Sequence, residues 1–274
     1  THRDDGRIHS FGTARAYESA LTQAAKWDQE NGNRGLDRFD NERAMAYLSE
    51  RAEYVGQSTL DLDRQALQIL PGVDKLDRIK SEVDRPGLAG QGRAYTPAQV
   101  RAIADVQSER NALATEIAHA AGLRAHELLT IRPVSEQPAS GHRTWSAERF
   151  SGREGVPYSV VGKGGLVREV QISADLGQRL EARRLDIPRN VTDRGVRYQT
   201  HYNIGGGNAW SSSFSKVSKS ELGYSTGAHG LRHSYAQQRM DELQGQGRQY
   251  ESSLEVVSQE MGHFRPDITE VYLR

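Results

Sequence analysis

Apolar residues recur with a helical period over the first 83 residues of the chain. Between residues 11 and 31, Tyr17, Ala20, Ala24 and Trp27 fall on one face of a helix, and a face of this kind packs against a core. The first part of the chain is therefore predicted to be a small all-helical domain. Its further helices are expected over residues 40–55, 58–70 and 73–83, and Tyr17, Trp27 and Leu48 are assigned to its core.

A stretch rich in glycine and proline interrupts this pattern. The sequence "DRPGLAGQGRAYTP" at residues 84–97 contains few large apolar side chains, which is typical of an interdomain linker. We expect a helical N-terminal domain at residues 1–84, a linker at 85–95 and a second domain at 96–274.

The second domain combines helical patterns with one strong hairpin signal. Two β-rich runs flank Lys163-Gly164-Gly165 within residues 158–173, which predicts a β-hairpin. Residues 189–209 show no clear period and predict a loop. The fold class expected is mainly α with a small β-sheet, α+β overall. Helices are expected from Thr96-Pro97, over 111–122 and 176–187, over 210–223, from His229 and over 253–262.

Composition narrows the classes of function only slightly. The 274 residues include 36 basic and 36 acidic side chains and no cysteine, so disulfides and thiolate chemistry are excluded. Divided at Gly90, the first part carries 13 basic and 16 acidic residues (−3) and the remainder 23 and 20 (+3). This weak division gives no support for nucleic-acid binding by itself. The apolar runs are shorter than the roughly 20 residues of a membrane span, and "THRDDGRIHS" lacks the apolar segment of a secretory signal. A cytoplasmic location without membrane contact is expected.

The stretch "HGLRHSYAQQRM" contains two histidines four residues apart, His229 and His233. This spacing can place two metal ligands on one helix face, but zinc motifs of the form H-E-x-x-H have a glutamate where this chain has Gly230. Arg232 between the histidines would also repel a cation. We therefore predict no metal and no cofactor here, and a helix start with a capping histidine is the plain structural alternative.

Three further short motifs, which we call boxes together with this one, occur in the chain. Two of them precede His229 and one follows Met240. The stretch "AAGLRAHELLTIR" contains Arg124 and Glu127, and "VVGKGG" places Lys163 on the predicted tight turn. The stretch "MGHFRPDITEVY" places His263 and Tyr272 nine residues apart.

Together the four boxes resemble those of the tyrosine recombinases, the phage-integrase family, and the resemblance covers nearly the whole chain. It implies that the N-terminal helices form a SAM-like core-binding domain on DNA and that residues 96–274 form the catalytic domain. It also implies a site-specific recombinase, possessed by bacterial mobile elements, that acts on double-stranded DNA with paired recognition sites. A homo-oligomer, a tetramer on DNA, and accessory proteins are the partners implied.

The resemblance assigns a role to each residue of the boxes. Breaking a phosphodiester without metal requires cations on the phosphoryl oxygens, and the planar fork of arginine matches two of them. Tyr272 is the expected nucleophile and must lose its proton as it attacks, because a tyrosine hydroxyl has a pKa near 10. The implied site comprises Arg124 and Arg232 on the phosphate, His229 as base, Lys163 as general acid, His263 as a hydrogen-bond donor and Tyr272.

Two residues of the boxes are expected to support the others. Glu127 is predicted to orient the arginines and His233 to be structural. Tyr235 and Tyr250 are alternative nucleophiles, and Arg168 competes with Lys163 for the role of acid.

The sequence departs from the family pattern at three places. Arg124 and Lys163 are 39 residues apart and Arg232 and His263 are 31 apart, both longer than usual. The inserted loops expected at residues 134–157 and 243–253 would contact DNA or a neighbouring subunit. Tyr272 is followed by two residues only, which puts the mode of oligomerisation in doubt.

Other functions compete with recombination. A type IB topoisomerase-like enzyme would use the same chemistry to relax DNA without pairing two sites. A catalytically silent DNA-binding protein of the same fold is the alternative outside enzymology. A metal-dependent nuclease is disfavoured because no acidic cluster has metal-ligand spacing.

Overall fold

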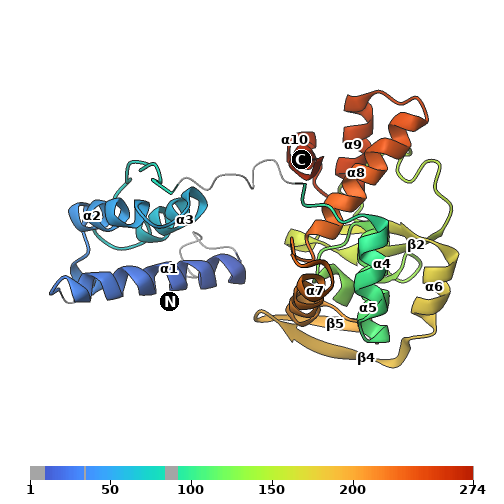
Figure 1. Cartoon of the computed structure of the whole chain (residues 1–274), viewed down its shortest axis with the longest axis horizontal. Coiled ribbons are helices and arrows are strands. Elements are labelled where there is room, and N and C mark those ends of the chain that lie inside the picture. Colours follow the sequence, from blue (N-terminus) through green and yellow to red (C-terminus); the bar gives the residue numbers. More distant parts are fainter. Residues whose placement is uncertain (1–9, 34, 84–91, 274) are drawn as a thin grey trace. The chain divides into compact units, whose positions relative to one another are not determined.

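The computed structural model describes residues 10–33, 35–83 and 92–273. The chain divides into two compact units, residues 1–89 and 90–274, each of which has its own core (Figure 1). Of the linker predicted at residues 85–95, residues 85–91 lie outside the described residues. Tyr95 is buried in the second unit, where its amide donates to Ser234 Oγ at 2.8 Å.

The described residues of the first unit form three helices and a 3₁₀ turn. Ser10 caps the first helix through a 3.1 Å bond from the Thr13 amide, and Asp40 caps the second through the Arg43 amide at 3.0 Å. Side-chain oxygens satisfy amides that the first turn of a helix leaves without partners. The elements are α1 (Phe11–Glu30), η1 (Leu36–Arg38), α2 (Asn41–Ala52) and α3 (Gln57–Leu67).

Of the three side chains assigned to the core of the first unit, one is fully buried. Leu48 is buried. Trp27 packs at the edge of the cluster and donates Nε1–H to Glu50 at 2.6 Å, while Tyr17 is only half-buried.

The fourth helix predicted over residues 73–83 is wrong, because this segment has no helical structure. Val73 and Leu76 are buried against the core without forming a helix. The Leu76 amide instead donates to Gln68 Oε1 at 2.8 Å, and the Glu82 amide to the Ala52 carbonyl at 2.8 Å. Apolar residues three apart fit either conformation, so their spacing misled the prediction.

The second unit combines helices with two small antiparallel sheets among its described residues (Figure 1). Thr96 and Gln99 form a capping box at the start of α4, with Pro97 at its first position. The α5 helix ends at Gly122, as the sequence predicts. The helices are α4 (Pro97–Asp105), α5 (Glu109–Ala121), α6 (Ala174–Glu181), α7 (Gly207–Leu222), α8 (Gly230–Gly245), α9 (Tyr250–Glu260) and α10 (Pro266–Glu270), with 3₁₀ turns η2 (Glu127–Leu129), η3 (Lys163–Gly165) and η4 (Val271–Leu273).

The hairpin predicted around Lys163 is confirmed. Strands β1 (Arg132–Pro133), β2 (Val156–Val161) and β3 (Val167–Ile172) form an antiparallel sheet in that order. Val161 pairs with Val167 across the turn. Tyr158, Val160, Val170 and Ile172 face the main core.

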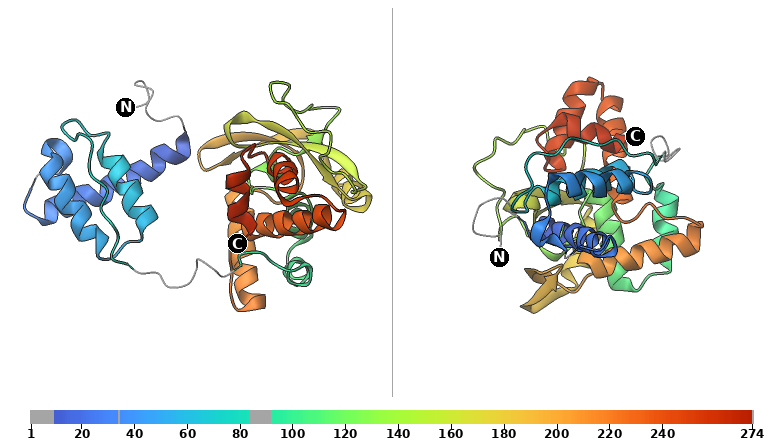
Figure 2. Two further views of the ribbon diagram at one scale, coloured as in Figure 1. Left: turned by 90° about the horizontal axis from the view of Figure 1, so that it is seen from above. Right: turned by 90° about the vertical axis from the view of Figure 1, so that its left-hand side faces the viewer.

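A second, two-stranded sheet lies where the sequence predicts the end of a helix and a loop. Strands β4 (Arg184–Asp193) and β5 (Val196–Tyr202) form a long antiparallel hairpin, drawn in tan in Figure 2. The helix predicted over 176–187 ends at Glu181, and the loop predicted over 189–209 is largely strand. Most residues of β4 are exposed, and Ile187 is 82% exposed. The strand therefore lacks the alternation of apolar and polar residues that identifies a half-buried strand.

The two predicted insertions differ in kind. Residues 134–155 form an irregular segment between β1 and β2. In the region of residues 243–253, α8 continues to Gly245 and α9 begins at Tyr250, so much of it is helical. The fold class, mainly α with small antiparallel sheets, is as predicted. No helix in the described ranges has the length and apolar character needed to cross a membrane.

Candidate active site

Gly122 sets the direction of the chain into the first arginine box. Its φ of 59° lies in the left-handed region, and a Cβ there would lie 2.7 Å from Tyr235 Cδ1. Only glycine fits both constraints. The chain then turns so that the backbone amide and Nη1 of Arg124 donate to the two oxygens of Glu127, each at 2.8 Å.

Glu127 is fully buried and lies among three arginines. Its Oε1 accepts from Arg124, its Oε2 accepts from Arg168 Nη2 at 2.7 Å, and Arg232 Nη1 lies 3.8 Å from Oε2. Burial alone would raise the pKa of Glu127, but Arg168, Arg232 and Arg124 outweigh it and hold the pKa well below its usual range. One buried carboxylate thus holds three cations, and the surplus of positive charge suits an anionic ligand.

Arg232 extends from α8 and is completely buried. Its Nη1 donates to the Gly122 carbonyl, and its Nη2 donates to the Met261 carbonyl at 3.2 Å and faces His263 Nε2 at 3.0 Å. Its buried Nε has no hydrogen-bond partner among the described residues. Desolvation and the charge of Arg124 lower the pKa of Arg232 to about 10, which leaves the guanidinium charged at neutral pH.

His229 precedes α8, and the helix can start there because Gly230 has no side chain. A Cβ at Gly230 would lie 2.4 Å from Thr226 Oγ1 and 2.5 Å from the Arg93 carbonyl. His229 keeps part of its surface open to solvent, while its ring packs beside Tyr272. Desolvation of its ring, followed by the charge of Arg232, lowers the pKa of His229 to about 4. The ring is therefore neutral at pH 7 and can accept a proton.

Tyr272 lies at the centre of the histidines. Its ring centroid is 5.3 Å from that of His229, 4.8 Å from that of His233 and 5.1 Å from that of His263. The Cζ of Arg232 lies 5.5 Å from the same ring. The Tyr272 carbonyl accepts from Gln237 Nε2 at 3.2 Å, which fixes the backbone of the short η4 turn on α8.

His233 holds Tyr272 rather than facing solvent. It is buried, and its Nδ1 lies 3.2 Å from the Tyr272 carbonyl. Because a carbonyl only accepts, Nδ1 carries the proton in this contact. This geometry supports the structural role predicted for His233.

His263 accepts a hydrogen bond in this arrangement. Arginine has no acceptor, so Nε2 accepts from Arg232 and the proton lies on Nδ1, 3.1 Å from Thr269 Oγ1. Burial and the charges of Arg232 and Arg124 lower the pKa of His263 to about 3. Donation from Nε2 to a phosphate, the predicted role, requires the ring to take up a proton or to change tautomer.

Lys163 lies apart from this cluster but on an adjoining surface. It is exposed on the turn between β2 and β3. A Cβ at the preceding Gly162 would lie 3.3 Å from Glu127 Oε1 and 3.9 Å from Arg124 Nη1, so the turn passes directly over that ion pair. Lys163 and Arg124 also line one pocket of about 580 Å³.

Arg168 is the residue of the site whose role the sequence did not reveal. It is 1% exposed, and besides Glu127 it donates to the Glu260 carbonyl at 2.6 Å. It is therefore fixed inside the protein and does not compete with Lys163 for an exposed position. The available signal was its place on β3, where it shares the inward-facing side with Val170 and Ile172.

The alternative nucleophiles are placed less favourably than Tyr272. Tyr235 is buried and donates its hydroxyl to Glu260 Oε2 at 2.8 Å, and burial with the Glu260 charge raises its pKa far above 10. Tyr250 is exposed at the start of α9. Among the described residues no group of three or more histidine, aspartate or glutamate side chains is arranged to hold a metal ion.

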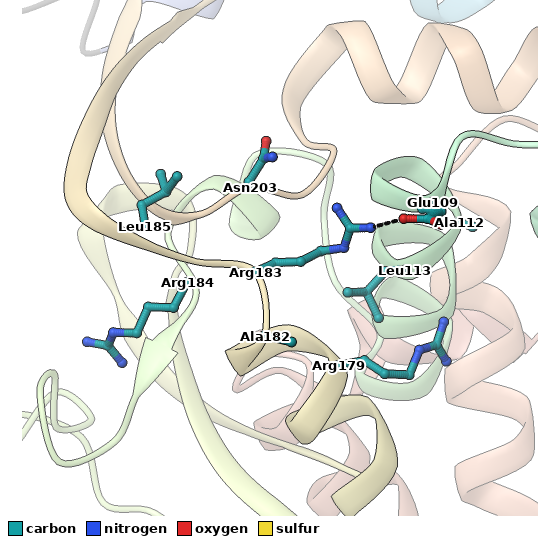
Figure 3. A pocket seen from close by; sticks show the side chains of 9 residues that line it. All are labelled: Glu109, Ala112, Leu113, Arg179, Ala182, Arg183, Arg184, Leu185 and Asn203. Atoms are coloured by element: carbon teal, nitrogen blue, oxygen red, sulfur yellow. Dashed lines mark hydrogen bonds and ion pairs between the residues drawn. The ribbon is translucent and has the colours of Figure 1, made fainter.

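A second pocket lies elsewhere in this unit and has a different character (Figure 3). It measures about 750 Å³, and its arginines are paired with carboxylates. Arg179 lies 2.6 Å from Glu116, Arg183 lies 2.5 Å from Glu109, and Arg184 pairs with Glu136. Paired charges leave little attraction for a further anion.

Comparison with solved structures identifies the fold. XerH site-specific recombinase bound to palindromic difH substrate has 17% sequence identity and a TM-score of 0.54, over 96% of this chain and 74% of that chain. The Tn1549 transposon integrase in complex with a circular intermediate DNA has 12% identity and a TM-score of 0.55, over 99% and 92%. A lambda integrase dimer bound to a COC′ core site has 15% identity and a TM-score of 0.57, over 98% and 90%.

The chain therefore has the fold of the tyrosine recombinases, as the sequence boxes predict. No protein-family model and no curated protein matches its sequence. The likeness lies in the fold, at identities of 12% to 17%.

Proposed function

We propose that this protein is a site-specific DNA recombinase that cleaves and rejoins duplex DNA through a 3′-phosphotyrosyl intermediate. The observation that carries the proposal is the position of Tyr272. Its ring lies within about 5.5 Å of Arg232 and of three histidine rings. A tyrosine so surrounded can lose a proton to a neutral base beside cations that attract a phosphate.

The reaction follows from the roles of these groups. Tyr272 Oη attacks the phosphorus, and its proton passes to His229. The bond to the 5′-oxygen breaks, and Lys163 supplies the proton that this oxygen needs to leave as a hydroxyl. Arg124 and Arg232 bind the non-bridging oxygens, and each preorganised donor contributes about 3–4 kcal/mol in the transition state. His263 donates to the phosphate once its Nε2 carries a proton. The phosphotyrosyl ester retains the energy of the original bond, so rejoining needs no other reactant.

The comparisons support DNA as the substrate and recombination as the outcome. The similar structures are XerH recombinase, Tn1549 integrase and lambda integrase, and each of them is bound to DNA. A separate helical N-terminal unit is consistent with a clamp around the duplex, in which specificity comes from base contacts and affinity from phosphate contacts. We propose paired DNA sites and a homo-oligomer, a tetramer, as the working state.

Covalent capture tests this function without knowledge of the target site. The full chain is incubated with fragmented DNA from its source and with a random-sequence duplex library, then denatured, and the attached DNA is sequenced. We expect adducts from the wild type that end in a common sequence, and none from Tyr272→Phe. Tyr250→Phe is the matched control and should form adducts at the wild-type rate.

The other outcomes identify the competing functions. Adducts that persist in Tyr272→Phe would contradict the nucleophile. Adducts without a common sequence, together with relaxation of supercoiled DNA, would favour a topoisomerase-like enzyme. Sequence-specific binding without adducts would favour a silent DNA-binding protein.

A further inference from the structure

The pocket beside Arg124 is lined by other residues than those of the tyrosine cluster. It measures about 580 Å³ and lies within the second unit, between the Lys163 turn and strand β5. Arg232, His229, His263 and Tyr272 do not line it. The basic, aromatic and amide side chains of its lining are those of Arg124, His126, Arg132, Lys163, Arg197, Tyr198 and Gln199.

The charge of this pocket is unbalanced. Four of its lining residues are Arg124, Arg132, Lys163 and Arg197, and none is a carboxylate. Only Arg124 has an ion pair among the described residues, with Glu127. The pocket of Figure 3 is the internal contrast, since its arginines are matched by glutamates.

The hydrogen bonding of Arg132 is a second, independent indication that this pocket binds an anion. Its Nε is buried and has no hydrogen-bond partner among the described residues, and its Nη2 makes one long contact of 3.4 Å to Gln199 Oε1. A buried donor without a partner costs about 1–3 kcal/mol. An anionic ligand at the pocket would supply acceptors to this guanidinium.

Neutral groups complete the lining. The rings of His126 and Tyr198 lie 6.1 Å apart at an angle of 31°, and Gln199 presents an exposed amide on the same strand. Cations flanked by an aromatic pair and an amide match a sugar-phosphate backbone with its base edges. This set of groups matches a simple inorganic anion less well, because such an anion would contact only the cations and leave the aromatic pair and the amide without a partner.

The proposed reaction indicates which side of the cleaved bond the pocket binds. Arg124 holds the scissile phosphate and Lys163 protonates the departing 5′-oxygen, and the pocket begins at these two residues. We propose that Arg132 and Arg197 bind the backbone of the leaving strand, the strand that ends in the new 5′-hydroxyl. This inference rests on the proposed recombinase function and adds a second binding site to it.

The consequence concerns the intermediate. After cleavage Tyr272 holds one strand covalently, while the leaving strand has only non-covalent contacts. Cations on its phosphates keep the 5′-hydroxyl near the phosphotyrosyl ester. Their strength sets the balance between rejoining the same strand and releasing it for exchange.

Salt dependence of binding tests the contact itself. The full-length Arg132→Gln, Arg197→Gln and Arg183→Gln variants are titrated with a random-sequence duplex over a series of KCl concentrations. Each lost phosphate contact reduces the slope of log K against log salt by about 1. We expect this reduction for Arg132→Gln and Arg197→Gln, and the wild-type slope for Arg183→Gln, which alters the other pocket. Unchanged slopes for both pocket variants would overturn the proposal.

Neutral phosphates locate the contact on one strand. On the site mapped by covalent capture, a single methylphosphonate replaces a phosphate on either side of the cut. We expect Arg197→Gln to cause no further loss of affinity when the neutral phosphate is on the 5′-hydroxyl side, and its full loss when it is on the tyrosine side. The opposite pattern would overturn the assignment to the leaving strand.

The capture experiment separates the two failures. If the wild type forms no adduct, the proposed function fails and the leaving-strand assignment fails with it. If adducts form but the salt slopes do not change, the function stands and only the inferred pocket is wrong. Thermal unfolding of each variant shows whether a changed slope arises from lost folding.

Discussion

At the scale of single residues, the site depends on one carboxylate. Glu127 contacts Arg124 and Arg168 and lies 3.8 Å from Arg232, and all of its side chain is buried. Removing one partner of a buried ion pair leaves an uncompensated charge, and the cost is about 3–5 kcal/mol. Here the loss would leave three guanidinium groups without a counter-charge.

We therefore expect Glu127→Gln to lower the free energy of unfolding by about 3–5 kcal/mol, measured by urea titration at neutral pH. Added phosphate should restore part of the loss, because an anion replaces the missing charge. The matched control is Glu148→Gln, since Glu148 is exposed and pairs with Arg248 on the surface, and such pairs contribute about 0–1 kcal/mol.

The pH dependence of stability has a definite sign. The pKa of Glu127 is depressed in the folded protein, so its contribution is present above about pH 4.3, the value of a free glutamate, and is lost as the pH falls further. The acid limb of stability against pH should be flatter for Glu127→Gln than for the wild type. A loss below about 1 kcal/mol at neutral pH, with an unchanged acid limb, would contradict the central role of this carboxylate.

Residues of the site differ in how far the sequence could predict them. Arg124, Arg232, His263 and Tyr272 belong to boxes with fixed internal spacing, and the structure brings them together. Arg168 has no such box, because a single arginine on a strand is ordinarily a surface residue. Its burial depends on Glu127, 41 residues away, and pairing at that range is not visible in local patterns.

At the scale of elements, the segment of residues 134–155 fastens the end of α9. The Ser146 amide donates to Gln259 Oε1 at 2.7 Å, and the Trp145 ring meets the Phe264 ring edge-to-face at 4.8 Å. Phe264 directly follows His263 and has a φ of 54°, a left-handed conformation that costs an aromatic residue of order 1–3 kcal/mol. The contact with Trp145 therefore stabilises the backbone that positions His263.

Replacing Trp145 tests this positioning role. We expect Trp145→Ala to slow covalent adduct formation by about tenfold or more, which corresponds to about 1.4 kcal/mol in the transition state. DNA affinity should stay at the wild-type value, because the change acts on the orientation of His263. Trp145→Phe should recover most of the rate, since it keeps an aromatic contact with Phe264.

A surface variant of the same region serves as the control. Arg248→Gln removes an exposed ion pair with Glu148 and should leave the rate of adduct formation unchanged. If Trp145→Ala lowers affinity and rate equally, the segment acts in DNA binding and the positioning role is wrong.

Prediction of the strands succeeded where one face of the strand is buried and failed where most of the strand is exposed. The β2–β3 hairpin has strict alternation on β3 and a glycine turn, and both signals are local. The β4–β5 hairpin has mostly exposed residues on β4, including Ile187, and helical propensity at its start extended the predicted helix into it. Its pairing is held by the ladder and by contacts with η2, which a sequence window does not contain.

At the scale of the whole molecule, the chain consists of two units with separate cores. The cluster around Leu48 contains only residues of the first unit, and the clusters around Trp210 and Tyr235 contain only residues of the second. Each unit thus buries its own apolar surface, which is the condition for independent folding. In the proposed function, both units bind the same duplex and a linker joins them.

The isolated second unit, residues 90–274, tests this organisation. We expect it to unfold at the same urea concentration as the corresponding transition of the full chain, because its core lacks no residue. Its affinity for the mapped DNA site should fall by about 10²–10⁴, because the first unit no longer adds a second, intramolecular contact. At saturating protein concentration, it should still form the Tyr272 adduct, since every proposed catalytic residue lies in this unit. An unfolded fragment would contradict the separate cores, and a fragment that binds as tightly as the full chain would contradict the two-unit clamp.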